Sequence, residues 1–365
     1  MQVPYFSFQA VNEELKKEWH SQIGNVIEAG VYINGPYKEL FEKEWASIVQ
    51  ATYSIGVGNG LDGLVLSLKA LDIGKGKIVA IPSHTFIATW NAVELAGAQA
   101  FGIDVDSNGL IDLELLETLD AKIDAVIPVH MHGQMVDMKR LCSWARKKGV
   151  KVIEDASQAH LAFRDGRYAG TWGDAGVFSL YPTKNLGALG DAGVVVTDSL
   201  SLRNRLSSLS NYGSSLTDKY MHELIGINSR LDEIQAACLL VNLGNLLKLT
   251  ERRREIAKKY LENVRNPRIQ FLNINNDLSN VWHHMPILSE TRDSLRSYLE
   301  LKGVGTEIHY PFAAGTEYHQ INILKGYDFP RADKLSRTIL SIPNHPWLSD
   351  EQINYVIDIL NLFTD

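Results

Sequence analysis

A lysine in a loop between two apolar runs has the clearest chemical potential in this chain. The segment from Phe178 to Lys184 leads out of one apolar run into a loop with proline and glycine, and a second apolar run begins at Gly193. Lysine rarely lies between buried strands unless its amine has a task. A desolvated lysine has a lowered pKa and can form a Schiff base with an aldehyde, while Ser179 nearby can bind a phosphate. The alternative interpretation is a solvated loop lysine.

A carboxylate ends another apolar run. Asp155 follows Val150–Glu154, at the carboxyl edge where open α/β sheets bind ligands. A carboxylate there is costly unless it is paired, and a protonated pyridine nitrogen is one suitable partner. The alternative interpretation is that Asp155 caps the next helix.

A glycine-bearing loop follows the first apolar run and opens a helical pattern. Gly58–Gly63 fits the dinucleotide-binding pattern G-x-G-x-x-G, which also needs an acidic residue at the end of the next strand. That strand runs into Pro82-Ser83-His84 without a carboxylate. A simpler possibility is that the free N–H groups of the helix N-terminus bind a phosphate, and a tight turn without a ligand is the alternative.

The three features together supply a phosphate cradle, a carboxylate for a pyridinium and a lysine for an aldehyde. These are the groups that bind pyridoxal 5'-phosphate (PLP). Each feature is weak alone, but the combination predicts a PLP enzyme. Two other hypotheses stay open: an NAD-dependent sugar dehydrogenase, which rests on Gly58–Gly63, and a PLP-fold regulator or binding module without turnover.

The elements that must position these groups form an α/β pattern. Short runs rich in Val and Ile are mostly apolar on both of their faces, which is typical of a sheet covered on both sides. Helical patterns at Leu61–Leu71 and Thr85–Leu95 between them predict a mainly parallel sheet. The predicted strands are Tyr53–Val57, Lys77–Ile81, Gln99–Asp104, Asp124–His130, Val150–Glu154, Ala175–Leu180 and Gly193–Thr197.

A second, smaller unit is expected after a long helix. The helical pattern runs from Ser229 to about Val264, and Gly244 is expected to break or kink it. A strand near Val304–Tyr310 and a closing helix near Asp350–Leu362 follow. With 365 residues, two domains are expected, residues 1–245 with an N-terminal arm and residues 246–365.

Composition excludes several classes of function. The formal net charge of -7 argues against broad binding to nucleic acid or acidic membranes. The N-terminus lacks a secretory signal pattern, and no apolar stretch is long enough to span a bilayer. Cys142 and Cys238 show no metal or disulfide spacing, so we expect reduced thiols, no metal and a cytoplasmic protein.

Blocks spread along nearly the whole chain resemble, in the same order, the sugar-nucleotide aminotransferases of the DegT/StrS type. The resemblance implies the aspartate-aminotransferase fold (fold type I), PLP, a homodimer with shared active sites, and a role in bacterial amino-sugar biosynthesis. Some relatives have histidine in place of the lysine and catalyse dehydration, and Lys184 argues against that here. The blocks are Gly35-Pro36 with Phe41-Glu42, residues 82–89, 127–130, 154–160, 179–190 and 226–237, and Ile308-His309-Tyr310-Pro311.

The resemblance also implies roles for individual residues. Lys184 matches the Schiff-base lysine and Asp155 the pyridinium partner, and Gln158 lies beside the cofactor ring oxygen. Glutamate would displace Lys184 from PLP, Lys184 would move the proton at the α-carbon, and the reverse path would aminate a sugar ketone. The remaining matches are Gly60, Leu61 and Ser179 for the phosphate, Asn228 for the phosphate of the neighbouring subunit, Phe86 (with His84 as runner-up) for ring stacking, and Tyr181, His309 and Tyr310, with His84, for sugar contacts.

Two loops refine the expected substrate. Gly60-Leu61-Asp62-Gly63 and Asn211-Tyr212-Gly213-Ser214 resemble the subgroup that aminates C3 of dTDP-3-oxo-6-deoxyhexoses. The chain departs from that subgroup at Gly63, where alanine is usual, and at His132, where the family often has tyrosine. It also lacks the common Pro-x-His spacing after Tyr310. These departures leave C4 amination as an alternative within the family.

Overall fold

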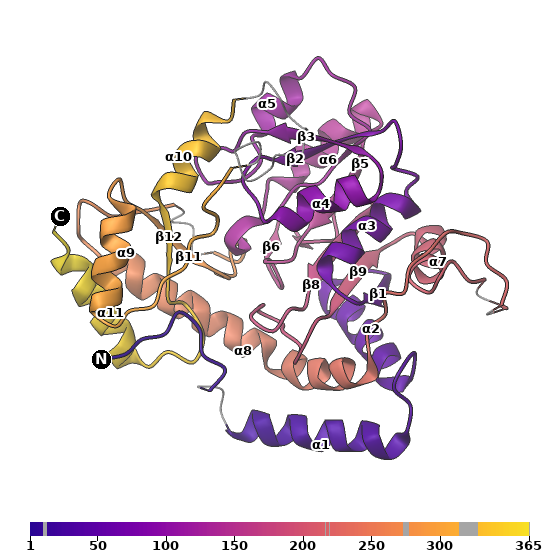
Figure 1. The fold of residues 1–365 in the computed structure, drawn as a ribbon, viewed down its shortest axis with the longest axis horizontal. Coiled ribbons are helices and arrows are strands. Elements are labelled where there is room, and N and C mark those ends of the chain that lie inside the picture. Colours follow the sequence, from indigo (N-terminus) through magenta and orange to yellow (C-terminus); the bar gives the residue numbers. More distant parts are fainter. Residues whose placement is uncertain (10–12, 216, 219, 273–276, 314–327, 365) are drawn as a thin grey trace.

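The computed structural model describes residues 1–9, 13–215, 217–218, 220–272, 277–313 and 328–364. A large sheet with helices on both faces occupies one side of the molecule, and a small sheet with its own helices occupies the other (Figure 1). Both chain ends lie beside the small sheet, and the long helix α8 (Glu233–Asn263) runs beneath both units (Figure 1). None of the helices in these residues is long and apolar enough to cross a membrane.

The large sheet has seven strands in the order β1-β9-β8-β5-β4-β2-β3. All neighbouring pairs from β8 to β3 are parallel, and β9 is antiparallel to both of its neighbours, so the expected mainly parallel sheet is confirmed. The strands are β1 (Tyr53–Val57), β2 (Ile78–Pro82), β3 (Gln99–Ile103), β4 (Ala125–Val126), β5 (Lys151–Asp155), β8 (Ala175–Ser179) and β9 (Gly193–Thr197); β6 (Phe163–Arg164) and β7 (Arg167–Tyr168) form a separate hairpin.

Helices bury both faces of this sheet, which explains why its strands are apolar throughout. Leu64, Val93 and Leu206, from α3, α4 and α7, pack on one face. The other face is covered by α2 and α8 near β9, and by α5 and α6 near β4. These helices are α2 (Pro36–Val49), α3 (Gly60–Ala70), α4 (Ile87–Leu95), α5 (Leu113–Thr118), α6 (Met138–Lys148) and α7 (Leu200–Leu209); α1 (Glu13–Ala29) packs on α8.

The strand predicted at Asp124–His130 is shorter than expected. Only Ala125–Val126 forms a continuous ladder, and Val129 makes one further bridge to Asp155. Pro128 lies between them and has no N–H to donate to a ladder. The chain then turns at Met131–Gly133, which brings His132 toward the end of β5.

The small unit contains an antiparallel sheet in the order β10-β11-β12. The N-terminal arm belongs to its packing, because the fully buried Val3 lies in its apolar core and pairs with Val304. The sequence divides the chain at residue 245, and this boundary stays a prediction. The elements are β10 (Gln270–Phe271), β11 (Met285–Leu288), β12 (Ile339–Ile342), α9 (Arg292–Leu301), α10 (Pro330–Thr338) and α11 (Asp350–Leu362), the last as expected from the sequence.

Three expectations for the second half of the chain are wrong. The segment Val304–Tyr310 is not a strand, because its backbone bonds alternate between the N-terminal arm and β12. Helix α8 continues through Gly244, whose surroundings are open, since one glycine costs only about 1 kcal/mol against the packing of the flanking turns. The helix also begins at Glu233 rather than Ser229, because Ser229 N–H bonds to Ser210 instead.

Candidate active site

The predicted chemical groups converge at the carboxyl edge of the large sheet. Asp155 ends β5 and Ser179 ends β8, and these strands are parallel neighbours. The first turn of α3 reaches the same edge, since a Cβ on Gly60 would lie only 3.0 Å from Cβ of Ser179. Lys184 follows β8 by one turn of the loop, with its N–H bonded to the carbonyl of Tyr181 at 2.8 Å.

Asp155 is a buried carboxylate with two donors. It is 6% exposed; its Oδ2 accepts a hydrogen bond of 2.9 Å from Oγ1 of Thr89, and its Oδ1 accepts one of 3.2 Å from N–H of Ser157. The next elements along the chain are the strands β6 and β7, so Asp155 caps no helix. The helix-cap interpretation is therefore wrong, and Thr89 is a partner that the sequence reasoning did not single out.

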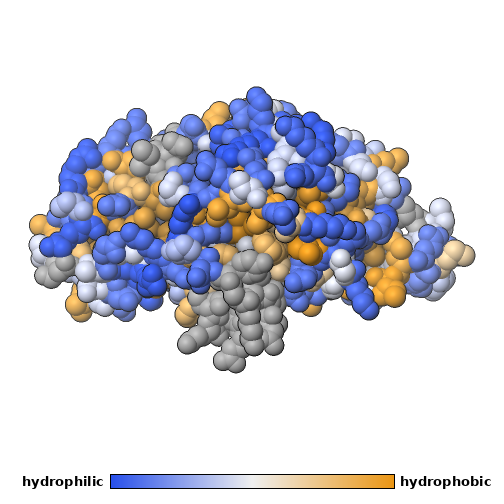
Figure 2. Space-filling view, turned by 90° about the horizontal axis from the view of Figure 1, so that it is seen from above, coloured by the Kyte–Doolittle hydropathy of each residue, from blue (hydrophilic) through white to orange (hydrophobic). Residues whose placement is uncertain are grey.

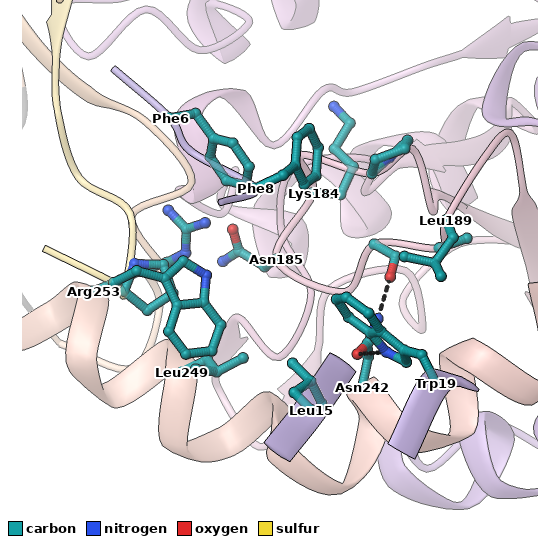
Figure 3. A pocket seen from close by; sticks show the side chains of 15 residues that line it. Phe6, Phe8, Leu15, Trp19, Lys184, Asn185, Leu189, Asn242, Leu249 and Arg253 are labelled. Atoms are coloured by element: carbon teal, nitrogen blue, oxygen red, sulfur yellow. Dashed lines mark hydrogen bonds between the residues drawn. The ribbon is translucent and has the colours of Figure 1, made fainter. Parts of the chain in front are cut away.

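Lys184 has an amine without a partner among the described residues. No hydrogen bond or ion pair holds its Nζ, while surrounding protein desolvates it and lowers its pKa to about 8, although the charge of Asp155 acts in the opposite direction. Figure 3 shows the amine pointing away from the pocket that its stem lines. Asn185 anchors the loop by donating from Nδ2 to the carbonyl of Val281 at 3.1 Å. The loop therefore presents an amine of lowered basicity.

The first turn of α3 can receive a phosphate. Asn59 caps the helix, because its Oδ1 accepts from N–H of Asp62 at 2.8 Å. The N–H groups of Gly60 and Leu61 belong to the first turn and have no acceptor within the helix. A side chain at position 60 would be crowded, because a Cβ there would lie 3.0 Å from Cβ of Ser179. The backbone and hydroxyl donors at this point fit an anion such as the cofactor phosphate.

Gln158 has an amide orientation fixed by its neighbours. Its Oε1 accepts from N–H of His132 at 2.6 Å, so its Nε2 faces the other way and donates to the hydroxyl of Tyr310 at 3.2 Å. His132 has a φ of 60°, a left-handed conformation unusual for this residue type. The amide thus presents N–H donors toward Tyr310, on the side where an oxygen acceptor would be accommodated.

The two candidates for ring stacking differ in their surroundings. His84 is fully buried, burial lowers its pKa to about 4, and its Nε2 lies 3.1 Å from the carbonyl oxygen and 3.2 Å from the nitrogen of Tyr310. Phe86 is 53% exposed, with its ring 5.5 Å from that of Tyr310. The geometry favours Phe86 for stacking and assigns His84 to holding the backbone of Tyr310.

The remaining predicted residues are exposed or carry other contacts. Asn228 and Tyr181 are exposed, and Asn228 pairs through its backbone with Asn211. His309 Nδ1 lies 2.9 Å from Oγ of Ser341, and burial lowers the pKa of this histidine to about 3. The sequence after Tyr310, which lacks the common Pro-x-His spacing, continues into residues that the structure does not describe.

Comparisons with known proteins agree with this arrangement. Residues 13–361 match the DegT/DnrJ/EryC1/StrS aminotransferase family. The chain belongs to this family. The chain is therefore a PLP-dependent aminotransferase of the sugar-aminotransferase family. This confirms the predicted enzyme class and the predicted cofactor at the level of the family.

Two similar relatives are named as transaminases of dTDP-linked amino sugars. The chain is 38% identical to a dTDP-3-amino-3,4,6-trideoxy-alpha-D-glucose transaminase of Streptomyces venezuelae, over 98% of this chain and 94% of the relative. It is also 38% identical to a dTDP-3-amino-3,6-dideoxy-alpha-D-galactopyranose transaminase of Aneurinibacillus thermoaerophilus, over 99% of each.

Solved structures of family members match the fold along its length. The structure of S. venezuelae DesV in complex with a ketimine intermediate covers 100% of both chains with a TM-score of 0.94 and 38% identity. The structure of NtdA from Bacillus subtilis, with bound cofactor PMP, covers 98% of this chain and 84% of that one, with a TM-score of 0.91 and 27% identity.

Proposed function

We propose that this protein transfers the amino group of glutamate to the C3 ketone of a dTDP-linked 3-oxo-6-deoxyhexose, with PLP as cofactor. The choice of C3 is supported by the loops at Gly60–Gly63 and Asn211–Ser214, and by the relatives that form 3-amino sugars. One observation carries the PLP assignment: the amine of Lys184, which has no hydrogen-bond or ion-pair partner among the described residues and a pKa lowered to about 8, lies close enough to Asp155 for the charge of this carboxylate to act on it.

The residues at this edge of the sheet fit PLP. The N–H groups of Gly60 and Leu61 and the hydroxyl of Ser179 would hold its phosphate, and Gln158 would donate to its ring oxygen. Phe86 would stack on the ring from the exposed side. When bound, PLP supplies an electron-accepting ring that stabilises negative charge on the carbon next to the reacting nitrogen.

Lys184 and Asp155 have different roles in the proposed reaction. Lys184 acts as a nucleophile near neutral pH because desolvation lowers its pKa, and it moves a proton to and from the donor's α-carbon as base and acid. Asp155 holds a proton on the ring nitrogen, and the donors from Thr89 and Ser157 keep its carboxylate in one orientation. Their convergence allows both halves of a transamination.

Four residues are proposed to form the nucleotide-sugar site: Tyr181, His309 and Tyr310 by direct contact, and His84 by holding the backbone of Tyr310. Tyr310 is the best placed of the four, since it lies against His84, Gln158 and Phe86. His84 acts through Tyr310 in this arrangement, because its own Nε2 is engaged with the backbone of that residue.

We further propose a homodimer whose active sites are shared between subunits. Asn228 is exposed, and it precedes Ser229, whose Oγ accepts from N–H of Gly58 at 2.9 Å. Large apolar side chains are exposed in the preceding segment, with Ile225 91% and Tyr220 80% exposed. Figure 2 shows hydrophobic residues exposed at several places across the face seen there, its right-hand part included.

An absorbance spectrum combined with product analysis tests the proposed function. The purified protein should be yellow, and borohydride should bleach it and fix PLP to Lys184; a colourless protein that binds NAD would instead support the dehydrogenase. Turnover of glutamate with a panel of dTDP- and UDP-linked 3-oxo and 4-oxo sugars would exclude a regulator without activity. An amine at C4 of the product would overturn the C3 assignment while leaving PLP intact.

A further inference from the structure

Glu154 is a carboxylate enclosed by protein, and in the part of the chain that the structure describes four nitrogen atoms face it. It is 0% exposed, and its Oε1 accepts from N–H of Trp172 at 2.6 Å and of Gly173 at 2.9 Å. Its Oε2 accepts from N–H of Gly170 at 2.9 Å and lies 3.0 Å from Nε2 of His130. Burial of a carboxylate is costly unless hydrogen bonds compensate for the lost hydration. The carboxylate is therefore stable only while the segments that carry these nitrogens keep their places.

The ring of His130 has a proton position fixed by its neighbours. The residue is buried, and its Nδ1 accepts a hydrogen bond of 3.2 Å from N–H of Val136. Because Nδ1 accepts, the proton of the neutral ring lies on Nε2, which donates to Glu154. Each ring nitrogen therefore has one partner, and the ring joins the loop after β4 to the end of β5.

The loop that His130 closes contains His132. N–H of Val136 bonds to the ring at one end of this loop, and at the other end N–H of His130 donates to the carbonyl of Asp155 at 3.1 Å. His132 lies between them with a φ of 60°, a conformation that persists only where the surrounding structure holds it. Its N–H is the donor that fixes the amide oxygen of Gln158. The ring of His130 thus helps to hold the turn on which the orientation of Gln158 depends.

Glu154 lies behind the candidate active site. Glu154 and Asp155 are successive residues of β5, so their side chains leave opposite faces of the sheet. Asp155 meets Thr89 of α4 on one face, and Glu154 meets His130 on the other. A molecule bound beside Asp155 is therefore out of reach of Glu154. Any effect of Glu154 on that molecule must pass through the residues that this carboxylate holds.

We propose that His130 and Glu154 are positioning residues for the cofactor. Their hydrogen bond holds the turn at Met131–Gly133, and this turn keeps an N–H of Gln158 directed toward the ring oxygen of PLP. The inference rests on the proposed function, in which Gln158 donates to that oxygen. Without the hydrogen bond from His132, the amide is free to turn its own oxygen toward the ring oxygen, and two acceptors repel each other.

A merely structural role for the pair gives a different expectation. Loss of a buried hydrogen bond lowers stability, because it leaves a buried donor or acceptor unsatisfied. Such a loss leaves the visible absorbance of bound PLP unchanged, since this absorbance responds to the groups that surround the cofactor. Its effect on turnover would also be independent of Gln158, so the effects of the two substitutions would multiply.

Variants of the PLP-loaded protein separate the two roles. His130→Leu removes both hydrogen bonds of the ring, and it should shift the visible absorbance maximum in the same direction as Gln158→Leu. Turnover per bound PLP should fall about fivefold or more, since a donor to a charged group is misdirected. Tyr260→Phe is the matched control, because it removes a buried hydrogen bond of 2.9 Å to the carbonyl of Pro343 in the small unit. This control should lower thermal stability without moving the absorbance maximum.

The double variant His130→Leu/Gln158→Leu tests whether one residue acts through the other. Once the amide is absent, His130→Leu should change turnover per bound PLP by less than about twofold. Effects that multiply, or a maximum that moves in Gln158→Leu but not in His130→Leu, overturn the positioning pair alone. A maximum that stays unchanged in Gln158→Leu overturns the proposed contact of Gln158 with the ring, and the pair with it.

Two further measurements decide the question if His130→Leu fails to fold. In the wild-type protein with nitrogen-labelled histidine, NMR should find a proton on Nε2 of His130 and none on Nδ1, with and without PLP. Glu154→Gln offers one accepting oxygen in place of two, and it should shift the absorbance maximum in the same direction as Gln158→Leu. A proton on Nδ1, or an unchanged maximum in Glu154→Gln, overturns the proposal.

Discussion

The amide oxygen of Gln158 accepts a hydrogen bond of 2.6 Å from the backbone N–H of His132. This single contact decides which way the amide faces, because the oxygen is committed and the nitrogen must point toward Tyr310. His132 reaches that position through a left-handed backbone conformation at the turn after β4. The N–H donor that Gln158 is expected to offer to the ring oxygen of the cofactor therefore depends on the turn at His132, which comes from another part of the chain.

Gln158→Glu should disturb the cofactor ring while leaving the fold intact. A carboxylate can still accept from His132, but it cannot donate to a ring oxygen and adds a negative charge there. We expect a shifted visible absorbance maximum and turnover reduced about tenfold or more, since a donor to a charged group is lost. An unchanged spectrum at equal PLP content would contradict the role of this amide.

Lys184→Ala should abolish turnover without unfolding the protein. The substitution removes the nucleophile and the proton carrier together, and the side chain makes no hydrogen bond or ion pair among the described residues. Mass spectrometry after borohydride treatment should find no PLP attached to the chain. Normal transamination by this variant would show that another residue carries the cofactor.

Attachment of PLP to the cofactor-free protein should become faster as the pH rises through about 8. Desolvation lowers the pKa of Lys184 from 10.5 to about 8, and only the uncharged amine attacks an aldehyde. Because the folded pKa is the lower one, this group makes the cofactor-free protein more stable as the pH rises between these two values. Borohydride trapping at a series of pH values measures the midpoint; one near 10.5 would mean that the amine is fully solvated.

Asp155→Asn should keep PLP bound but slow both half-reactions. A neutral amide cannot hold a proton on the ring nitrogen, although it can still accept the hydrogen bond from Thr89. We expect a loss of about tenfold or more in each half-reaction, measured by rapid-mixing absorbance. A change in thermal stability alone, with activity per bound PLP unchanged, would make Asp155 a structural residue.

Mixing two inactive variants should restore activity if the sites are shared. Asn228→Asp places a carboxylate against the cofactor phosphate and should weaken PLP binding. After subunit exchange with Lys184→Ala, each mixed dimer holds one doubly damaged site and one intact site, so about one quarter of wild-type activity should return. If Asn228 serves its own chain, every mixed site carries a lesion and mixing restores nothing.

Much of the site could be read from local patterns. The run Tyr53–Val57 forms β1 with the predicted bounds, Asp155 ends β5, and Lys184 lies in the loop after β8, as expected. Such features can be predicted from a few consecutive residues, because the pattern of apolar residues in a strand and the residue types in a loop are local properties of the sequence. The sequence by itself therefore determined the mainly parallel sheet and the position of the two residues that we propose as most central to the chemistry.

The tertiary structure decided which residues far apart in the sequence come into contact. Thr89 meets Asp155 across 66 positions of the chain, and His84 meets Tyr310 across 226. The choice between a helix cap and a buried carboxylate at Asp155 follows from which segments pack together. Hydrogen bonds and desolvation depend on distance in space, and packing alone sets that distance for residues far apart in the chain.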